Sequence, residues 1–134
     1  MEINDLTQLI IGLAYKVHNA LGSGFSEKVY ENALRIEIER AGIVVKQQDT
    51  LLVRYEGQVV GLFYPDLWIE DTLIIEVKSL KMIPRLCEVQ LVNYLAATGI
   101  DNGLLINFGS SVEVRRKFRE YKPKGSPVEA LLAK

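Results

Sequence analysis

The sequence predicts an α/β fold in which a mixed sheet of four to five strands is flanked by helices. Three observations predict it. Apolar residues recur at helical spacing through the first 41 residues. Short runs rich in β-branched and aromatic residues follow, up to about residue 77. A third helical segment then leads to a last apolar run at residues 103–108.

The length and composition are those of one domain. The chain has 134 residues, and 49% of them are hydrophobic, which is enough to bury a core. We find no internal repeat and no linker, and predict a single domain over residues 1–124 with a C-terminal tail at residues 125–134.

Three helices are predicted. The first has Asn4 or Asp5 as its N-cap and ends at Gly22. The second runs over residues 26–41, and the third over residues 84–98, with a proline at its start and a glycine after its end. The expected strands are residues 43–46, 50–55, 62–69, 73–77 and 103–108, and residues 112–121 form either a further strand or a short helix.

Three charged residues lie within the hydrophobic hairpin of residues 62–78, outside its polar turn at residues 70–72. Glu76 and Lys78 share one face of their strand, because side chains alternate. A three-residue turn at residues 70–72 places Asp66 opposite Glu76, with Cβ atoms roughly 4.5–5.5 Å apart. Carboxylates that close repel each other unless a cation lies between them or one is protonated. Together with the carbonyl of Val77, they form a partial shell for a hard cation such as Mg²⁺.

Lys78 lies beside this predicted metal site, where an ammonium can orient a water or stabilise charge on a phosphate. The alternative is an edge hairpin whose Asp66, Glu76 and Lys78 face solvent as ordinary cross-strand pairs. The apolar neighbours in residues 73–77 favour the metal site, because unpaired charge is costly in a buried strand.

These residues carry a resemblance to a known superfamily. Asp66 followed by Glu76-Val77-Lys78 resembles the core of the PD-(D/E)xK phosphodiesterases. Residues 24–30 (GFSEKVY) resemble the signature of the GxxExxY family, which is usually grouped within that superfamily. Residues 18–22 (HNALG), the Gln90-x-x-x-Tyr94 spacing and residues 103–109 (GLLINFG) match the same family in the expected order. The resemblance implies a restriction-endonuclease-like core.

The resemblance also implies further site residues. Glu27 matches an acid on the first core helix that adds a metal ligand in several relatives; otherwise it is a carboxylate favoured by the helix dipole. Tyr30, about one turn on, is expected to donate a hydrogen bond to a carboxylate or phosphate. Gln90 and Tyr94 share a helix face and are expected to contact phosphate or Lys78, the alternative being amphipathic surface.

Charge and composition restrict the partners. The net charge of −1 gives no general attraction to nucleic acid, and residues 115–124 form the only strongly basic stretch, which suits either a backbone-binding strip or a solvated edge. No run approaches a membrane span, so we expect a soluble, cytoplasmic protein that does not bind membranes. Cys87 is the only cysteine and is expected to be a small core residue.

Two functional hypotheses follow. The first is a Mg²⁺- or Mn²⁺-dependent nuclease that cuts DNA or RNA, with Asp66, Glu76 and Glu27 at the metal and Lys78 beside the water. The second is a catalytically silent module of the same fold that binds nucleic acid or a protein partner. A hydrolase of a small phosphorylated substrate is a third, lesser alternative. A homodimer is compatible with the fold, although no residue argues for it.

Overall fold

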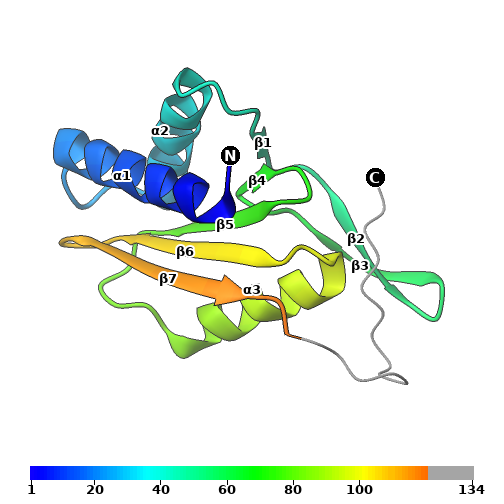
Figure 1. Ribbon diagram of the computed structural model, residues 1–134. Helices are drawn as coiled ribbons and strands as arrows, with labels where there is room; N and C mark the ends of the chain where they lie inside the picture. The colour runs from blue at the N-terminus through cyan, green and yellow to red at the C-terminus, as the bar shows by residue number, and fades with distance from the viewer. Residues whose placement is uncertain (121–134) are drawn as a thin grey trace.

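The computed structural model describes residues 1–120 and confirms the α/β class, with three helices and a five-stranded mixed sheet in this part of the chain (Figure 1). The predicted tail, and the predicted end of the domain at residue 124, lie outside the described residues. The elements are α1 (Ile3–Leu21), α2 (Glu27–Arg40), β1 (Lys46–Gln47), β2 (Leu51–Tyr55), β3 (Gln58–Phe63), β4 (Leu67–Ile69), β5 (Leu73–Lys78), α3 (Arg85–Thr98), β6 (Asn102–Phe108) and β7 (Val112–Phe118).

The sheet has the strand order β1-β4-β5-β6-β7. β5 and β6 are parallel and are joined through α3, whereas the other neighbouring pairs are antiparallel. Helices α1 and α2 cover one face of this sheet, and α3 covers the other (Figure 1). β2 and β3 form a separate antiparallel hairpin that projects from one end of the molecule (Figure 1).

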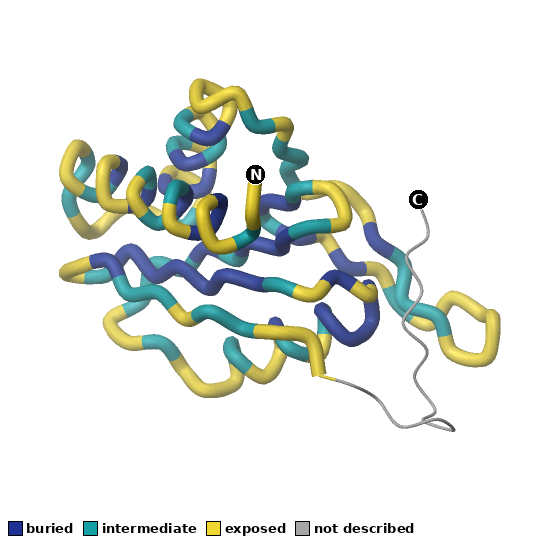
Figure 2. Tube along the Cα trace, viewed as in Figure 1, coloured by how far each residue is buried: buried dark blue, intermediate teal, exposed yellow. Residues whose placement is uncertain are grey.

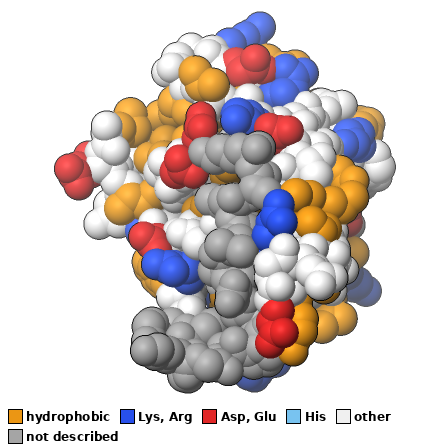
Figure 3. All heavy atoms as spheres, turned by 90° about the vertical axis from the view of Figure 1, so that its right-hand side faces the viewer, with side chains coloured by type: hydrophobic (Ala, Val, Ile, Leu, Met, Phe, Trp, Pro, Cys, Tyr) orange, Lys and Arg blue, Asp and Glu red, His pale blue; other side chains and the backbone are white. Residues whose placement is uncertain are grey.

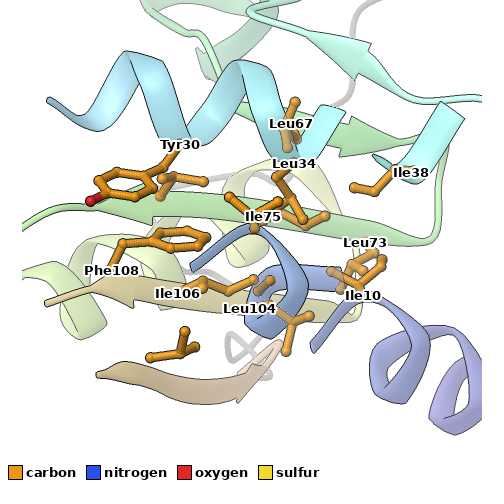
Figure 4. Close-up of a cluster of buried hydrophobic side chains, with 14 of the residues drawn as sticks. Ile10, Tyr30, Leu34, Ile38, Leu67, Leu73, Ile75, Leu104, Ile106 and Phe108 are labelled. Carbon is orange, nitrogen blue, oxygen red and sulfur yellow. The ribbon is translucent and has the colours of Figure 1, made fainter. Parts of the chain in front are cut away.

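The central strands β5 and β6 are buried on both faces (Figure 2). Ile75 and Ile106 pack with Leu34 of α2 and Ile10 of α1, the two helices that cover this face of the sheet (Figure 4). Ile74, which points the other way, packs in a second cluster against α3. Each such side chain contributes roughly 1.5–3 kcal/mol when fully buried. The apolar runs predicted as strands therefore form a rigid central support for the charged residues at the end of β5.

The predicted strand at residues 62–69 is wrong as a single element. β3 ends at Phe63 and belongs to the hairpin, while β4 begins at Leu67 and belongs to the main sheet. Pro65 lies between them, and because proline has no N–H it interrupts a ladder of strand hydrogen bonds. Asp66 consequently lies just before β4 rather than within a strand.

Other boundaries also differ from the prediction. Helix α1 begins at Ile3, with Glu2 rather than Asn4 or Asp5 at the N-cap position and without a side-chain cap. The oxygen of Asn4 instead accepts a hydrogen bond from Arg116 of β7. Residues 43–46 contribute little strand, because β1 has only two residues, and residues 112–118 form a strand and not a helix. No helix within residues 1–120 has the length and apolar character needed to cross a bilayer.

Candidate active site

Asp66 and Glu76 meet where β5 continues beyond the start of β4. Leu67 pairs with Ile75, as the predicted three-residue turn requires, so the next pair along places Asp66 opposite Glu76. Asp66 Oδ2 accepts a hydrogen bond from the backbone N–H of Val77 at 2.8 Å. The charge of Asp66 also acts on Glu76. The two acids thus converge on one point.

This pair cannot hold two negative charges easily. Burial, followed by the charge of Asp66, raises the pKa of Glu76 to about 9. Burial also raises the pKa of Asp66, against the opposing effect of the Val77 N–H. At neutral pH the pair therefore retains a proton. Oε1 of Glu76 is buried and has no hydrogen-bond partner in the described structure, which is costly for a polar atom.

Lys78 lies on the same face of β5 as Glu76, and its positive charge acts to lower the pKa of Glu76. Both residues line a pocket of about 290 Å³ between β5, α3 and the end of β3. Gln90 and Tyr94 of α3 line the same pocket, so four of the predicted residues lie together. The other lining residues are Leu62, Phe63, Tyr64, Cys87, Leu91 and Leu105.

A larger pocket of about 500 Å³ lies between α3 and the end of β7. It contains the ion pair of Glu88 with Lys117, at 2.7 Å, and none of the predicted site residues. Because Glu88 and Lys117 neutralise each other there, we take the smaller pocket, beside the two acids, as the candidate site.

Two residues that sequence reasoning missed, Glu31 and Gln48, extend the site. Glu31 of α2 is buried, with its carboxylate 2.9 Å from the ammonium of Lys28. The side-chain amide of Gln48 donates to Glu31 Oε1 at 3.2 Å and to Asp66 Oδ1 at 3.0 Å. Gln47 also donates to Glu31. Gln48 therefore bridges an acid on the helix to the acid that precedes β4.

The backbone holds Gln48 in this position. Its N–H donates to the carbonyls of Pro65 and Asp66, at 3.1 and 3.2 Å, and its φ of 54° lies in the left-handed region that most residues avoid. Such strained positions persist where the surroundings fix them, and they cluster at functional sites.

Glu27 and Tyr30 do not join the pocket. The charge of Glu31, which lies one turn later on α2 than Glu27, acts on Asp66. Tyr30 is fully buried on the opposite face of the sheet, where its hydroxyl donates to the carbonyl of Gly22 at 2.6 Å. That hydroxyl proton is therefore engaged by the backbone of Gly22.

The remaining residues of the resemblance form a structural cluster behind β5. Tyr30 stacks on Phe108, with ring centroids 4.6 Å apart (Figure 4). His18 Nε2 lies 2.9 Å from the carbonyl oxygen of Gly109. The buried Asn107 accepts from the N–H of Leu80 at 2.8 Å and donates to its carbonyl at 2.9 Å. These contacts fix the chain immediately after Lys78.

In residues 1–120 no group of three or more His, Cys, Asp or Glu side chains forms a metal-binding cluster. The predicted set of Asp66, Glu76 and Glu27 is therefore not assembled as a triad. The acids that do converge are a pair, with Glu31 connected to it through Gln48.

The fold and this acid pair with an adjacent lysine define a protein of the restriction-endonuclease-like class. The family described as the PD-(D/E)XK nuclease superfamily matches residues 4–119, and the chain belongs to it. Comparisons with curated proteins and with solved structures gave no match.

The raised pKa of Glu76 predicts a pH-dependent stability in the absence of metal. Because the pKa is about 9 in the folded chain and near 4.5 ordinarily, its contribution is full below about pH 4.5 and is lost as pH rises toward 9. Glu76→Gln should remove this loss. Its melting temperature should exceed that of the wild type by several degrees at pH 8, since 1 kcal/mol corresponds to about 4 °C at this size, and the gap should close near pH 5. Melting curves in EDTA that differ equally at both pH values would contradict this account.

The contact of Glu31 with the site predicts a change at Asp66. Glu31→Gln removes a negative charge that raises the pKa of Asp66, so that pKa should fall. Carboxyl-carbon NMR titration measures it directly. Glu39→Gln is the matched control, because Glu39 lies on the same helix but pairs with Arg35. Equal shifts in the two variants would show that Glu31 has no specific link to Asp66.

Proposed function

We propose that the protein is a Mg²⁺- or Mn²⁺-dependent nuclease, a phosphodiesterase acting on DNA or RNA, of the GxxExxY group within its superfamily. The observation that carries the proposal is the half-buried pair Asp66 and Glu76, which retains a proton at neutral pH and leaves Oε1 of Glu76 without a donor, beside the pocket that Lys78 lines. The superfamily is typically metal-dependent.

The residues present suit a hard divalent cation. Such cations take oxygen ligands, and the pair offers carboxylate oxygens at a point where a cation can replace the shared proton. The carbonyl of Val77 suits the set, because the N–H and C=O of a strand residue point to the same side and this N–H points at Asp66. Glu27 as an additional ligand remains a prediction. When bound, the cation supplies an activated water and stabilises charge on the phosphate.

Side chains of the pocket supply the remaining contacts in this proposal. Lys78 presents its ammonium to the pocket, where it orients the attacking water or bonds a phosphate oxygen. Gln90 and Tyr94 line the same pocket and, in this proposal, bond the same phosphate or Lys78. Tyr94 is fixed for this role because its ring stacks on Phe63, with centroids 3.6 Å apart. A phosphate held at this point is oriented before the reaction, which is the main contribution of positioning to catalysis.

The second candidate is a silent module that binds nucleic acid or a protein without chemistry. The absence of a three-acid cluster within residues 1–120 favours it. The two candidates differ in what a divalent cation does to the protein, and in whether Lys78 is needed for phosphodiester cleavage.

Cleavage tests the nuclease directly. Purified protein with Mn²⁺ should cut a mixture of single- and double-stranded DNA and RNA, and Lys78→Ala should lower the rate about 100-fold or more, as expected for loss of a group that stabilises the transition state. Lys81→Ala is the control, because Lys81 is exposed on the connection that follows β5 and should leave the rate unchanged. Equal activity of the wild type and Lys78→Ala would refute the assignment.

Metal binding should depend on pH with a definite sign. Since the cation displaces a proton held by groups with raised pKa values, Mn²⁺ should stabilise the protein more at pH 8 than at pH 6. A Mn²⁺ concentration ten times the Kd raises the free energy of unfolding by about 1.4 kcal/mol, which can be measured as a shift in melting temperature. Asp66→Asn and Glu76→Gln should abolish the shift, whereas Asp49→Asn, on the exposed loop after β1, should not. No shift in the wild type at either pH would favour the silent module.

A further inference from the structure

The pocket beside the two acids has a wall that phosphate binding does not explain. Leu62 and Tyr64, at the end of β3, line it together with Glu76 and Lys78. Both are largely exposed, Leu62 at 55% and Tyr64 at 48%. A phosphodiester needs donors and positive charge, not apolar surface. Exposed apolar side chains beside a polar site mark a surface that contacts the apolar part of a ligand.

This wall is rigid at its base. Phe63, between Leu62 and Tyr64, is buried, pairs with Leu51 of β2 and stacks on Tyr94 of α3. The stem of the hairpin is thereby anchored to the helix that carries Gln90. Figure 3, which views the hairpin end of the molecule, shows hydrophobic side chains at the surface among charged ones. Tyr64 therefore lines the pocket next to a residue, Phe63, that is held in place by packing.

Much of the positive charge of the basic strand β7 and its end is neutralised by acids. Three cations of the basic strand β7 and its end are paired with acids: Arg115 with Glu113, Lys117 with Glu88, and Arg119 with Asp101. The net charge of the whole chain is −1. Because duplex binding depends strongly on neutralised phosphates, affinity at this site requires another source. Stacking of bases on aromatic side chains is such a source for single strands.

We propose that this pocket takes one unpaired nucleobase, stacked on Tyr64 against Leu62, with the adjoining phosphate at Lys78, so that the substrate is a single-stranded or frayed polynucleotide. The inference rests on the proposed nuclease function. A volume of about 290 Å³ is at the small end of ligand pockets, roughly 300–1,000 Å³, and suits one nucleotide unit. A base inside a duplex is paired and stacked, and reaches such a pocket only when it is extruded.

Binding is measured with wild-type protein in EDTA, which prevents metal-dependent cleavage, at one fixed salt concentration. The probes are a fluorescent 12-nucleotide single strand, a blunt duplex of the same sequence, and the single strand with its central bases removed. The intact single strand should bind about ten-fold more tightly than either of the others, because only it offers accessible bases.

Substitutions at Tyr64 test whether its ring provides the contact with the base. Tyr64→Ala should weaken single-strand binding about ten-fold, and Tyr64→Phe should restore it, because the ring and not the hydroxyl is used. Tyr55→Ala is the matched control, since Tyr55 is an exposed tyrosine on the same hairpin that does not line the pocket. Thermal melting of each variant verifies that it is folded.

The proposal is overturned if the duplex or the base-free strand binds as tightly as the intact strand, or if folded Tyr64→Ala binds like the wild type. It is also overturned if Tyr55→Ala weakens binding as much as Tyr64→Ala. Cleavage confined to duplex DNA would overturn this inference and leave the nuclease function intact. Selective single-strand binding without cleavage in Mn²⁺ would instead support the pocket and reject the nuclease.

Discussion

The structure depends on a single electrostatic constraint, the burial of two carboxyl groups against each other beside β5. The hydrogen bond from the Val77 N–H to Asp66 depends on the break at Pro65. If β4 extended further, it would pair with Val77, and the Val77 N–H would belong to the sheet ladder. Because β4 starts only at Leu67, that N–H is free to bond Asp66 instead. A local interruption of the sheet thus creates the point at which the two acids converge.

The motif residues outside the pocket serve this geometry indirectly. Gly109 has no side chain, and a Cβ there would lie 2.9 Å from the carbonyl oxygen of Leu80. The side chain of Asn107 bonds both backbone groups of Leu80, and the hydroxyl of Ser79 donates to the carbonyl of Phe25 at 2.7 Å. These contacts fix the segment that follows Lys78. Several residues of the matching motifs therefore hold the end of β5 in place and do not lie in the pocket.

The sequence predicts local geometry well and tertiary contacts poorly. The opposition of Asp66 and Glu76 follows from the parity of their positions and the length of the turn, both of which are local. Helical spacing relates Tyr30 to Glu27 but does not tell that the Tyr30 side chain packs into the core. The role of Gln48 has no sequence signal, since it depends on β1 lying beside β4. Glu31 could have been singled out as an acid between the core positions Tyr30 and Leu34 of α2.

The charge of Lys78 alone is not enough to neutralise the two carboxylates of the site, whereas a divalent cation would be. Lys78 already acts on Glu76, yet the pKa of Glu76 remains at about 9, so one ammonium does not offset the burial of the pair. Two ionised carboxylates and one ammonium leave a net negative charge, which repels a phosphodiester. A divalent cation reverses that sign and lets both acids ionise. Under the proposed function, the free energy that the two acids cost the folded chain would therefore favour binding of a divalent cation.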